Sequence, residues 1–151
     1  MRNFKYLCIL FLIFFNNSAK TKINNLVFHG AYTFETNSAQ KACAVYVSIF
    51  NNTKSEFVIS SLSTDVAEKA EIHDVILTNE IVRMKKLDQL TIQPNEQVYF
   101  QPGGSHIMLM NLKQELADGS SFFITFKLDD GRENKVKVMV LNKKLRENFI
   151  E

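Results

Sequence analysis

Short runs of strand-favouring residues, separated by polar turns, are the feature of this sequence that most constrains its fold. Runs rich in Val, Ile, Phe, Tyr and Thr recur at residues 25–35, 42–51, 56–63, 69–77, 80–87, 97–101, 105–111, 121–129 and 133–141. No long segment shows helical periodicity. We therefore expect an all-β domain, a Greek-key sandwich or barrel of roughly 8 to 9 strands.

Turn residues mark the boundaries between these runs. The clearest hairpin signal is Asp130-Gly131, which lies between two apolar runs. Further turn signals occur at residues 51–53, 94–95 and 102–104, which are rich in Asn, Pro and Gly. These positions separate the predicted strands without requiring a long unstructured loop.

The N-terminal segment, residues 1–19, has the layout of a secretory signal peptide. Arg2 and Lys5 precede an apolar run from Tyr6 to Phe15, which is followed by small and polar residues ending at Ala19. A membrane-spanning helix needs about 17 to 25 apolar residues, so the run is too short for a span. We expect export to the periplasm, cleavage after Ala19 and no stable membrane insertion, with an uncleaved anchor as the alternative.

The remaining chain is expected to form one domain at residues 20–141, followed by a charged C-terminal tail at 142–151. The whole sequence has 18 Lys and Arg against 16 Asp and Glu, and removal of the signal peptide takes away Arg2 and Lys5. The charges are then balanced and scattered singly. This pattern gives no electrostatic footprint for nucleic acid or for an anionic membrane surface.

Cys43 is the only cysteine outside the signal peptide, so an internal disulfide is excluded. It shares one face of a predicted strand with Val45, Val47 and Ile49, which favours a small buried side chain over a reactive thiol. Neither paired carboxylates nor a Ser/His/Asp arrangement can be recognised in the sequence. We therefore expect a protein that is not an enzyme.

Histidine and methionine alternate in the strand that follows the glycine turn at residues 102–104. Because side chains two residues apart in a strand point the same way, His106, Met108 and Met110 form one row. The residues between them are apolar and suit a core. Such a row could also arise from packing alone, with methionine filling space in the core and histidine at its edge. Further ligand residues elsewhere in the chain would instead indicate a metal site.

Such partners occur in the runs at residues 69–77 and 80–87. A hairpin with Thr78-Asn79 as its loop would place His73 opposite Met84, with Cβ atoms about 4.5 to 5.5 Å apart. Two imidazoles and two thioethers form a soft, neutral ligand set that favours Cu(I) over zinc, calcium or magnesium. Such a site should hold Cu(I) near neutral pH and release it when the histidines become protonated. His29 is interpreted as a surface or core residue.

The spacing His73-x10-Met84-x21-His106-x-Met108 resembles the copper-binding signature of the periplasmic PCuAC copper chaperones. The block at residues 102–112 is also similar to that family. The resemblance implies a cupredoxin-like β-sandwich that binds one Cu(I) per chain. Periodicity alone leaves Met108 and Met110 as alternatives, whereas the resemblance selects Met108 and leaves Met110 as an auxiliary residue.

The resemblance also implies a function: transfer of copper by ligand exchange to an acceptor for assembly of the CuA centre. The implied acceptors are cytochrome c oxidase subunit II and a Sco-type assembly protein. Ala31-Tyr32 replaces a frequent Ala-Trp pair, and a His/Met-rich C-terminal extension is missing, so we expect one copper site. Two alternatives are an electron-transfer cupredoxin, which would need a Cys thiolate with two His, and a metal-independent interaction domain.

Overall fold

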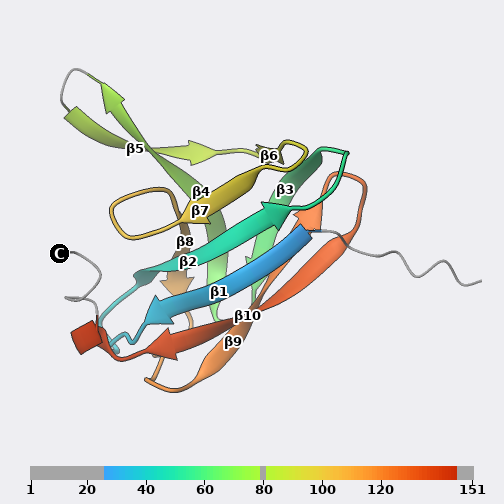
Figure 1. Cartoon of the computed structure of the whole chain (residues 1–151). Helices are drawn as coiled ribbons and strands as arrows, with labels where there is room; N and C mark the ends of the chain where they lie inside the picture. Colours follow the sequence, from blue (N-terminus) through green and yellow to red (C-terminus); the bar gives the residue numbers. More distant parts are fainter. Residues whose placement is uncertain (1–25, 79–80, 146–151) are drawn as a thin grey trace, which may run out of the picture.

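The computed structural model describes residues 26–78 and 81–145, which form ten strands (Figure 1). Their bounds are β1 (Leu26–Phe34), β2 (Ala42–Asn51), β3 (Phe57–Thr64), β4 (Ala67–Thr78), β5 (Ile81–Leu87), β6 (Leu90–Ile92), β7 (Gln97–Phe100), β8 (His106–Leu112), β9 (Ser121–Leu128) and β10 (Glu133–Leu141). A short 3-10 turn at residues 143–145 follows β10. The all-β prediction is confirmed.

Nine of the strands lie where the sequence predicted them, within about two residues at each end. The tenth, β6, has three residues and pairs with the start of β3, so it was too short to give an alternating pattern. The predicted signal peptide and the last part of the predicted tail, residues 146–151, lie outside the described residues. Within the described part of the chain, no helix has the length and apolarity needed to cross a bilayer.

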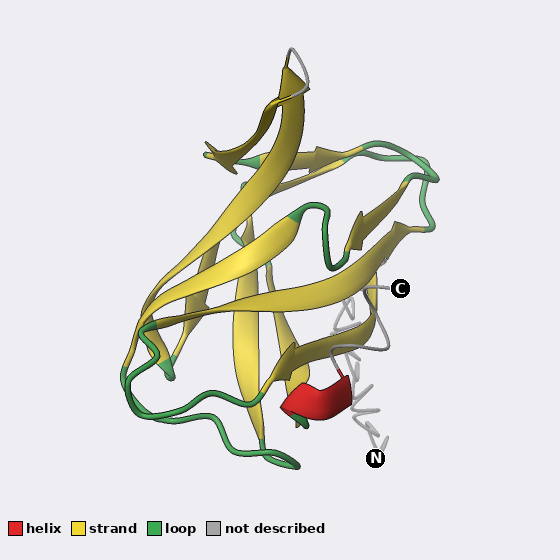
Figure 2. Ribbon diagram, turned by 90° about the vertical axis from the view of Figure 1, so that its left-hand side faces the viewer, coloured by secondary structure: helices red, strands yellow, loops and turns green. Residues whose placement is uncertain are grey.

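All ten strands belong to one sheet that curls around a common interior (Figures 1 and 2). The strand order is β5-β4-β8-β2-β1-β10-β9-β3-β6, and β7 pairs with β2 outside this path. Only β1 and β10 run parallel; all other recorded pairs are antiparallel. The first half of β2 pairs with β8 and its second half with β7. Strand β2 therefore joins the region that carries the His/Met row to the rest of the sandwich.

The core is built from the inward faces of alternating strands. In β9 every second side chain, from Phe122 to Leu128, is buried, while the residues between them are exposed or half-buried. In β8 Ile107 and Leu109 are fully buried, as the alternation predicts. The apolar face of β8 thus fixes the strand in the core, and its other face carries His106, Met108 and Met110.

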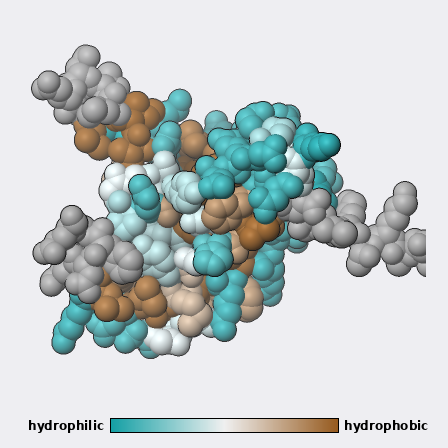
Figure 3. Space-filling model, in the orientation of Figure 1, coloured by the Kyte–Doolittle hydropathy of each residue, from teal (hydrophilic) through white to brown (hydrophobic). Residues whose placement is uncertain are grey.

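The hairpin of β4 and β5 projects from the body of the sandwich (Figures 1 and 2). Within the described part of the chain, β5 pairs with β4 alone and forms an edge of the sheet. The hairpin exposes Ile76, Val82 and Met84, and Figure 3 shows brown, hydrophobic atoms among teal ones on its projecting part. This arm is therefore supported along one side only.

Asn51 holds a loop and two strands together from a fully buried position at the end of β2. Its Nδ2 atom lies 2.8 Å from the carbonyl oxygens of Ser55 and Gln93 and 3.1 Å from that of Ile92. Its Oδ1 atom accepts hydrogen bonds from the backbone N–H and the hydroxyl of Thr53. The amide thus satisfies backbone groups of the β2–β3 loop and of the β6 end in one place.

Replacement of Asn51 by Ala should lower the free energy of unfolding by about 1–3 kcal/mol, because buried backbone carbonyls would lose their donor. Urea unfolding measures this change. The neighbouring Asn52 is exposed, so Asn52→Ala is the matched control and should leave stability almost unchanged. Equal midpoints for the two variants would contradict the structural role of Asn51.

Candidate metal site

A tight turn at residues 101–104 delivers His106 to the start of β8. The N–H of Gly104 donates to the carbonyl of Gln101 at 3.0 Å, which closes the turn. Pro102 and Gly103 occupy its two central positions, and Gly103 has a φ of 78°. Proline followed by a glycine with positive φ is typical of a type II turn. The predicted glycine turn is thereby confirmed.

His106 is 7% exposed, and one of its ring nitrogens has a hydrogen-bond partner in the turn. Its Nδ1 atom lies 3.0 Å from the carbonyl oxygen of Gly104. A carbonyl oxygen can only accept, so Nδ1 carries the hydrogen and Nε2 of the neutral ring keeps its lone pair. The turn therefore both positions this imidazole and selects its tautomer.

His73 in β4 stands directly opposite His106 in the β4–β8 pairing. The two rings meet edge to face with their centroids 5.7 Å apart. The Nε2 atom of His73 lies 3.3 Å from Oε2 of Glu71, and its Nδ1 atom is buried without a hydrogen-bond partner among the described residues. A buried, unpartnered ring nitrogen beside a second imidazole is the kind of group that a metal ion would satisfy.

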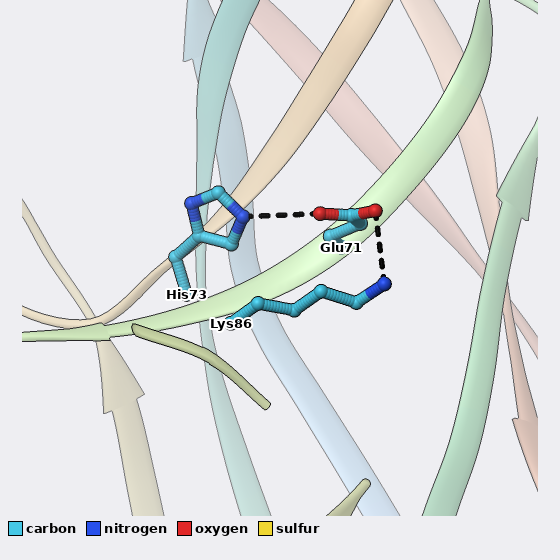
Figure 4. A network of polar contacts seen from close by, with 3 residues as sticks. All are labelled: Glu71, His73 and Lys86. Carbon is cyan, nitrogen blue, oxygen red and sulfur yellow. Dashed lines mark hydrogen bonds and ion pairs between the residues drawn. The ribbon is translucent and has the colours of Figure 1, made fainter. Parts of the chain in front are cut away.

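Glu71 links His73 to Lys86 of β5 (Figure 4). The Nζ atom of Lys86 donates to Oε1 at 3.0 Å, and the hydrogen bonds from Lys86 and then His73 lower the pKa of the Glu71 carboxyl. The carboxylate is therefore ionised and can only accept. This network was not predicted from the sequence, although the period-two rule places Glu71 on the same face as His73.

The predicted register of the β4–β5 hairpin is wrong by two residues. Met84 stands opposite Val75, and His73 stands opposite Lys86. The cause is that Thr78, a β-branched residue that favours extended backbone, remains in β4 and pairs with Ile81. Asn79, the other predicted loop residue, lies outside the described residues. A shift of two keeps Met84 on the same face as His73, as a diagonal neighbour at about 7–8 Å between Cα atoms.

Met108 follows His106 on the same face of β8, and Met110 lies one step further along. Met108 stands opposite Glu71 of β4, whereas Met110 stands opposite Lys69. Both methionines are half-buried. The pairing therefore places Met108 closer than Met110 to the two histidines.

A surface hollow runs between β2, β8 and the projecting hairpin. Its lining includes three of the four residues of the predicted ligand set, Met84, His106 and Met108. The rest of the wall is mixed, with apolar residues such as Val75 and Val82 beside the charged residues Glu35 and Lys143. Met84 is 65% exposed, so the hairpin holds its thioether at the open side of the hollow. The site thus combines one buried imidazole, that of His106, and one half-buried imidazole, that of His73, with a solvent-facing methionine.

Cys43 lines the hollow, but its side chain and that of His29 are not part of the row formed by His106, Met108 and Met110. Cys43 is 7% exposed and stands opposite Leu109, on the core side of β2. Burial raises the pKa of its thiol, and a hydrogen bond with Thr33 opposes this effect. His29 is exposed in β1, opposite Ser48. The structure therefore gives neither residue to the His/Met cluster.

The donors that the structure brings together are neutral and soft. Within residues 26–78 and 81–145, no group of three or more His, Cys, Asp or Glu side chains is arranged to hold a metal ion. The cluster instead contains two imidazoles and the thioethers of two different strands. Imidazole and thioether donors suit Cu(I), whereas hard cations require oxygen ligands.

These features define a β-sandwich with a His/Met cluster beside a surface hollow. Residues 26–140 match the family model described as "Putative lipoprotein LpqE-like", and the chain belongs to this LpqE-like family.

Two curated proteins are similar to the chain. The chain is 35% identical over 100 residues to the uncharacterised protein RP573 of Rickettsia prowazekii. It is 26% identical over 98 residues to "Putative lipoprotein Lxx21020" of Leifsonia xyli subsp. xyli. The matches cover 66% and 64% of this chain, but only 55% and 59% of those proteins.

Solved structures with the same fold include PCuAC domains. The copper-bound PCuAC domain from PmoF2 superposes with a TM-score of 0.66 at 14% identity, over 78% of this chain and 93% of that domain. The solution structure of CuI-DR1885 from Deinococcus radiodurans gives 0.62 at 25% identity, over 83% of this chain and 84% of that one. The predicted cupredoxin-like β-sandwich is therefore confirmed.

The burial of Cys43 predicts a pH dependence of stability. A thiol whose folded-state pKa is raised stabilises the native state fully below its unfolded pKa of about 8.5, and this contribution is lost as pH rises towards the folded value. Urea unfolding between pH 7 and pH 10 should show a steeper loss for the unaltered chain than for Cys43→Ala.

The rate at which Cys43 reacts with a thiol reagent at pH 8 is an independent check of its burial. Cys43 should react much more slowly in the native chain than in urea, because the thiolate is the reactive form and the side chain is covered. Similar rates in both conditions would contradict the buried position.

Proposed function

We propose that this protein is a Cu(I) carrier that binds one copper ion on its His/Met face. The observation that carries the proposal is the direct pairing of His73 and His106, each with one ring nitrogen left for a metal. Met84 and Met108 flank this pair on the same face. The PCuAC fold and the copper bound in two solved structures with this fold add support.

The four side chains would contribute in different ways. His106 would bind through Nε2, because its Nδ1–H is directed at the Gly104 carbonyl. His73 would bind through Nδ1, because its Nε2 faces Glu71. The thioethers of Met84 and Met108 would add soft, neutral donors that favour the +1 state of copper. Met110 would be an auxiliary residue.

Transfer by ligand exchange follows from the exposure of Met84. Its thioether stands on the open side of the hollow, while His106 is almost covered. An incoming donor would displace Met84 first and the imidazoles later, so that copper passes on without release of a free ion. The transfer step requires no group that forms a covalent intermediate, and we therefore propose a carrier rather than an enzyme.

Export and the acceptor belong to the same proposal. The signal-like residues 1–19 and the lipoprotein description of the family favour an exported chain. In the periplasm, the acceptor would be the CuA site of cytochrome c oxidase subunit II, or a Sco-type assembly protein that serves it.

The reduced protein should bind one Cu(I) per chain in an anaerobic titration against a competing chelator. His106→Ala and Met84→Ala should each lower the affinity at least roughly tenfold, equivalent to about 1.4 kcal/mol. A His73→Ala/His106→Ala double variant should bind no copper at the chelator concentrations that the unaltered chain resists. Unchanged affinity in that double variant would contradict the proposed site.

Met108 and Met110 offer a matched comparison, since they are the same residue type on the same face of one strand. Leucine replaces methionine with little change in volume, so Met108→Leu and Met110→Leu should fold alike. We expect Met108→Leu to weaken Cu(I) binding strongly and Met110→Leu to weaken it little. The reverse order would assign the ligand to Met110.

Because a ligand that binds only the native state raises Tm, an unchanged Tm with excess Cu(I) would favour the metal-independent interaction domain.

A further inference from the structure

We propose that Glu71 is a positioning residue that aims Nδ1 of His73 at the copper site. The inference rests on the proposed function, because it assigns the binding atom of one proposed ligand. It goes beyond the ligand set itself, since Glu71 would touch the imidazole and not the metal.

The contacts of the carboxylate carry the argument. One oxygen of Glu71 accepts from Lys86 at 3.0 Å and the other lies 3.3 Å from Nε2 of His73 (Figure 4). The two oxygens therefore have separate partners. Lys86 anchors the carboxylate from β5, which leaves the second oxygen directed at the ring of His73.

The state of the ring follows from this contact. An ionised carboxylate only accepts, so the hydrogen of a neutral His73 resides on Nε2 and the lone pair on Nδ1. Nδ1 lies on the side of the ring away from Glu71 in Figure 4 and is buried without a partner among the described residues. Ligating histidines usually donate their other ring N–H to a carboxylate or a carbonyl, which fixes the tautomer.

The two histidines of the pair are thus held in equivalent ways, each by an acceptor two residues earlier in the chain. The backbone carbonyl of Gly104 accepts from Nδ1 of His106, and Glu71 accepts from Nε2 of His73. One ring keeps Nε2 and the other keeps Nδ1 for a metal. Without Glu71, His73 would lose the contact that defines its ring orientation, while His106 would keep its own.

Three variants test this role. Glu71→Ala removes the acceptor, and Glu71→Gln keeps an acceptor oxygen without the charge. Glu68→Ala is the matched control, because Glu68 is a carboxylate of the same strand that accepts from the β8 side chain Asn111 at 2.8 Å. The Glu68→Ala variant loses the same charge and a cross-strand hydrogen bond, but no contact with a histidine.

NMR of the metal-free protein, labelled with 15N in its histidine rings, measures the contact independently of copper. The Nε2–H resonance of His73 should be visible and protected from exchange in the unaltered chain and in Glu68→Ala. Glu71→Ala should lose this protection. A hydrogen on Nδ1 of His73 in the unaltered chain, or equal protection in Glu71→Ala, would overturn the inference.

Anaerobic Cu(I) competition then measures the consequence. Loss of an outer partner of a ligating histidine typically costs about 10- to 100-fold in metal affinity. We expect a loss of this size in Glu71→Ala, a smaller loss in Glu71→Gln and none in Glu68→Ala. NMR of the copper-loaded protein should report Nδ1 of His73 as the bound nitrogen in the unaltered chain.

The outcomes separate the two proposals. Tight Cu(I) binding by both the unaltered chain and Glu71→Ala would overturn the role of Glu71 and leave the copper carrier intact. No Cu(I) binding by the unaltered chain would overturn both, even where the metal-free spectra show the Glu71 contact. Equal losses in Glu71→Ala and Glu68→Ala would assign the effect to charge and overturn the positioning role.

Discussion

The pairing of β4 with β8 is the interaction on which the rest of the site depends. It places His73 opposite His106 and, one step along, Glu71 opposite Met108. The register is fixed from the other face, where Ile72 and Ile107 form a buried pair. A slip by one residue would move every side chain of β4 to the wrong face. Burial of apolar side chains therefore determines which polar groups meet on the outside.

Most of the fold could be predicted because period-two alternation and turn residues are local signals. Nine of the ten described strands, the Pro102-Gly103 turn and the common face of His106 and Met108 all follow from them. The pairing of Met84 could not be fixed in this way, because it depends on where a hairpin closes. The closure differed by one residue at each end, so Met84 came to lie opposite Val75 rather than His73. The ligand assignment itself stays a prediction.

The Glu71 network shows a different limit of sequence reasoning. Period two places Glu71 beside His73, but only the β4–β5 register brings Lys86 within reach of the same carboxylate. The observed register thus separates Met84 from direct opposition to His73 and fills that position with Lys86. A register shift of two residues in one hairpin therefore places an ammonium group, and not a thioether, opposite the imidazole of His73. Such a network can be predicted only when the pairing between the strands is known.

The one-sided support of the β4–β5 arm has a kinetic consequence. Among the described residues β5 has no neighbour beyond β4, so its backbone hydrogen bonds to β4 can break without disturbing the buried core. Local opening of this arm would carry Met84 away from the two histidines while β8 keeps its place. If copper occupies this face, its residence time is then governed by the opening rate of a hairpin. The rate of hairpin opening can be far higher than the rate of global unfolding. A stable β-sandwich could therefore still release copper quickly.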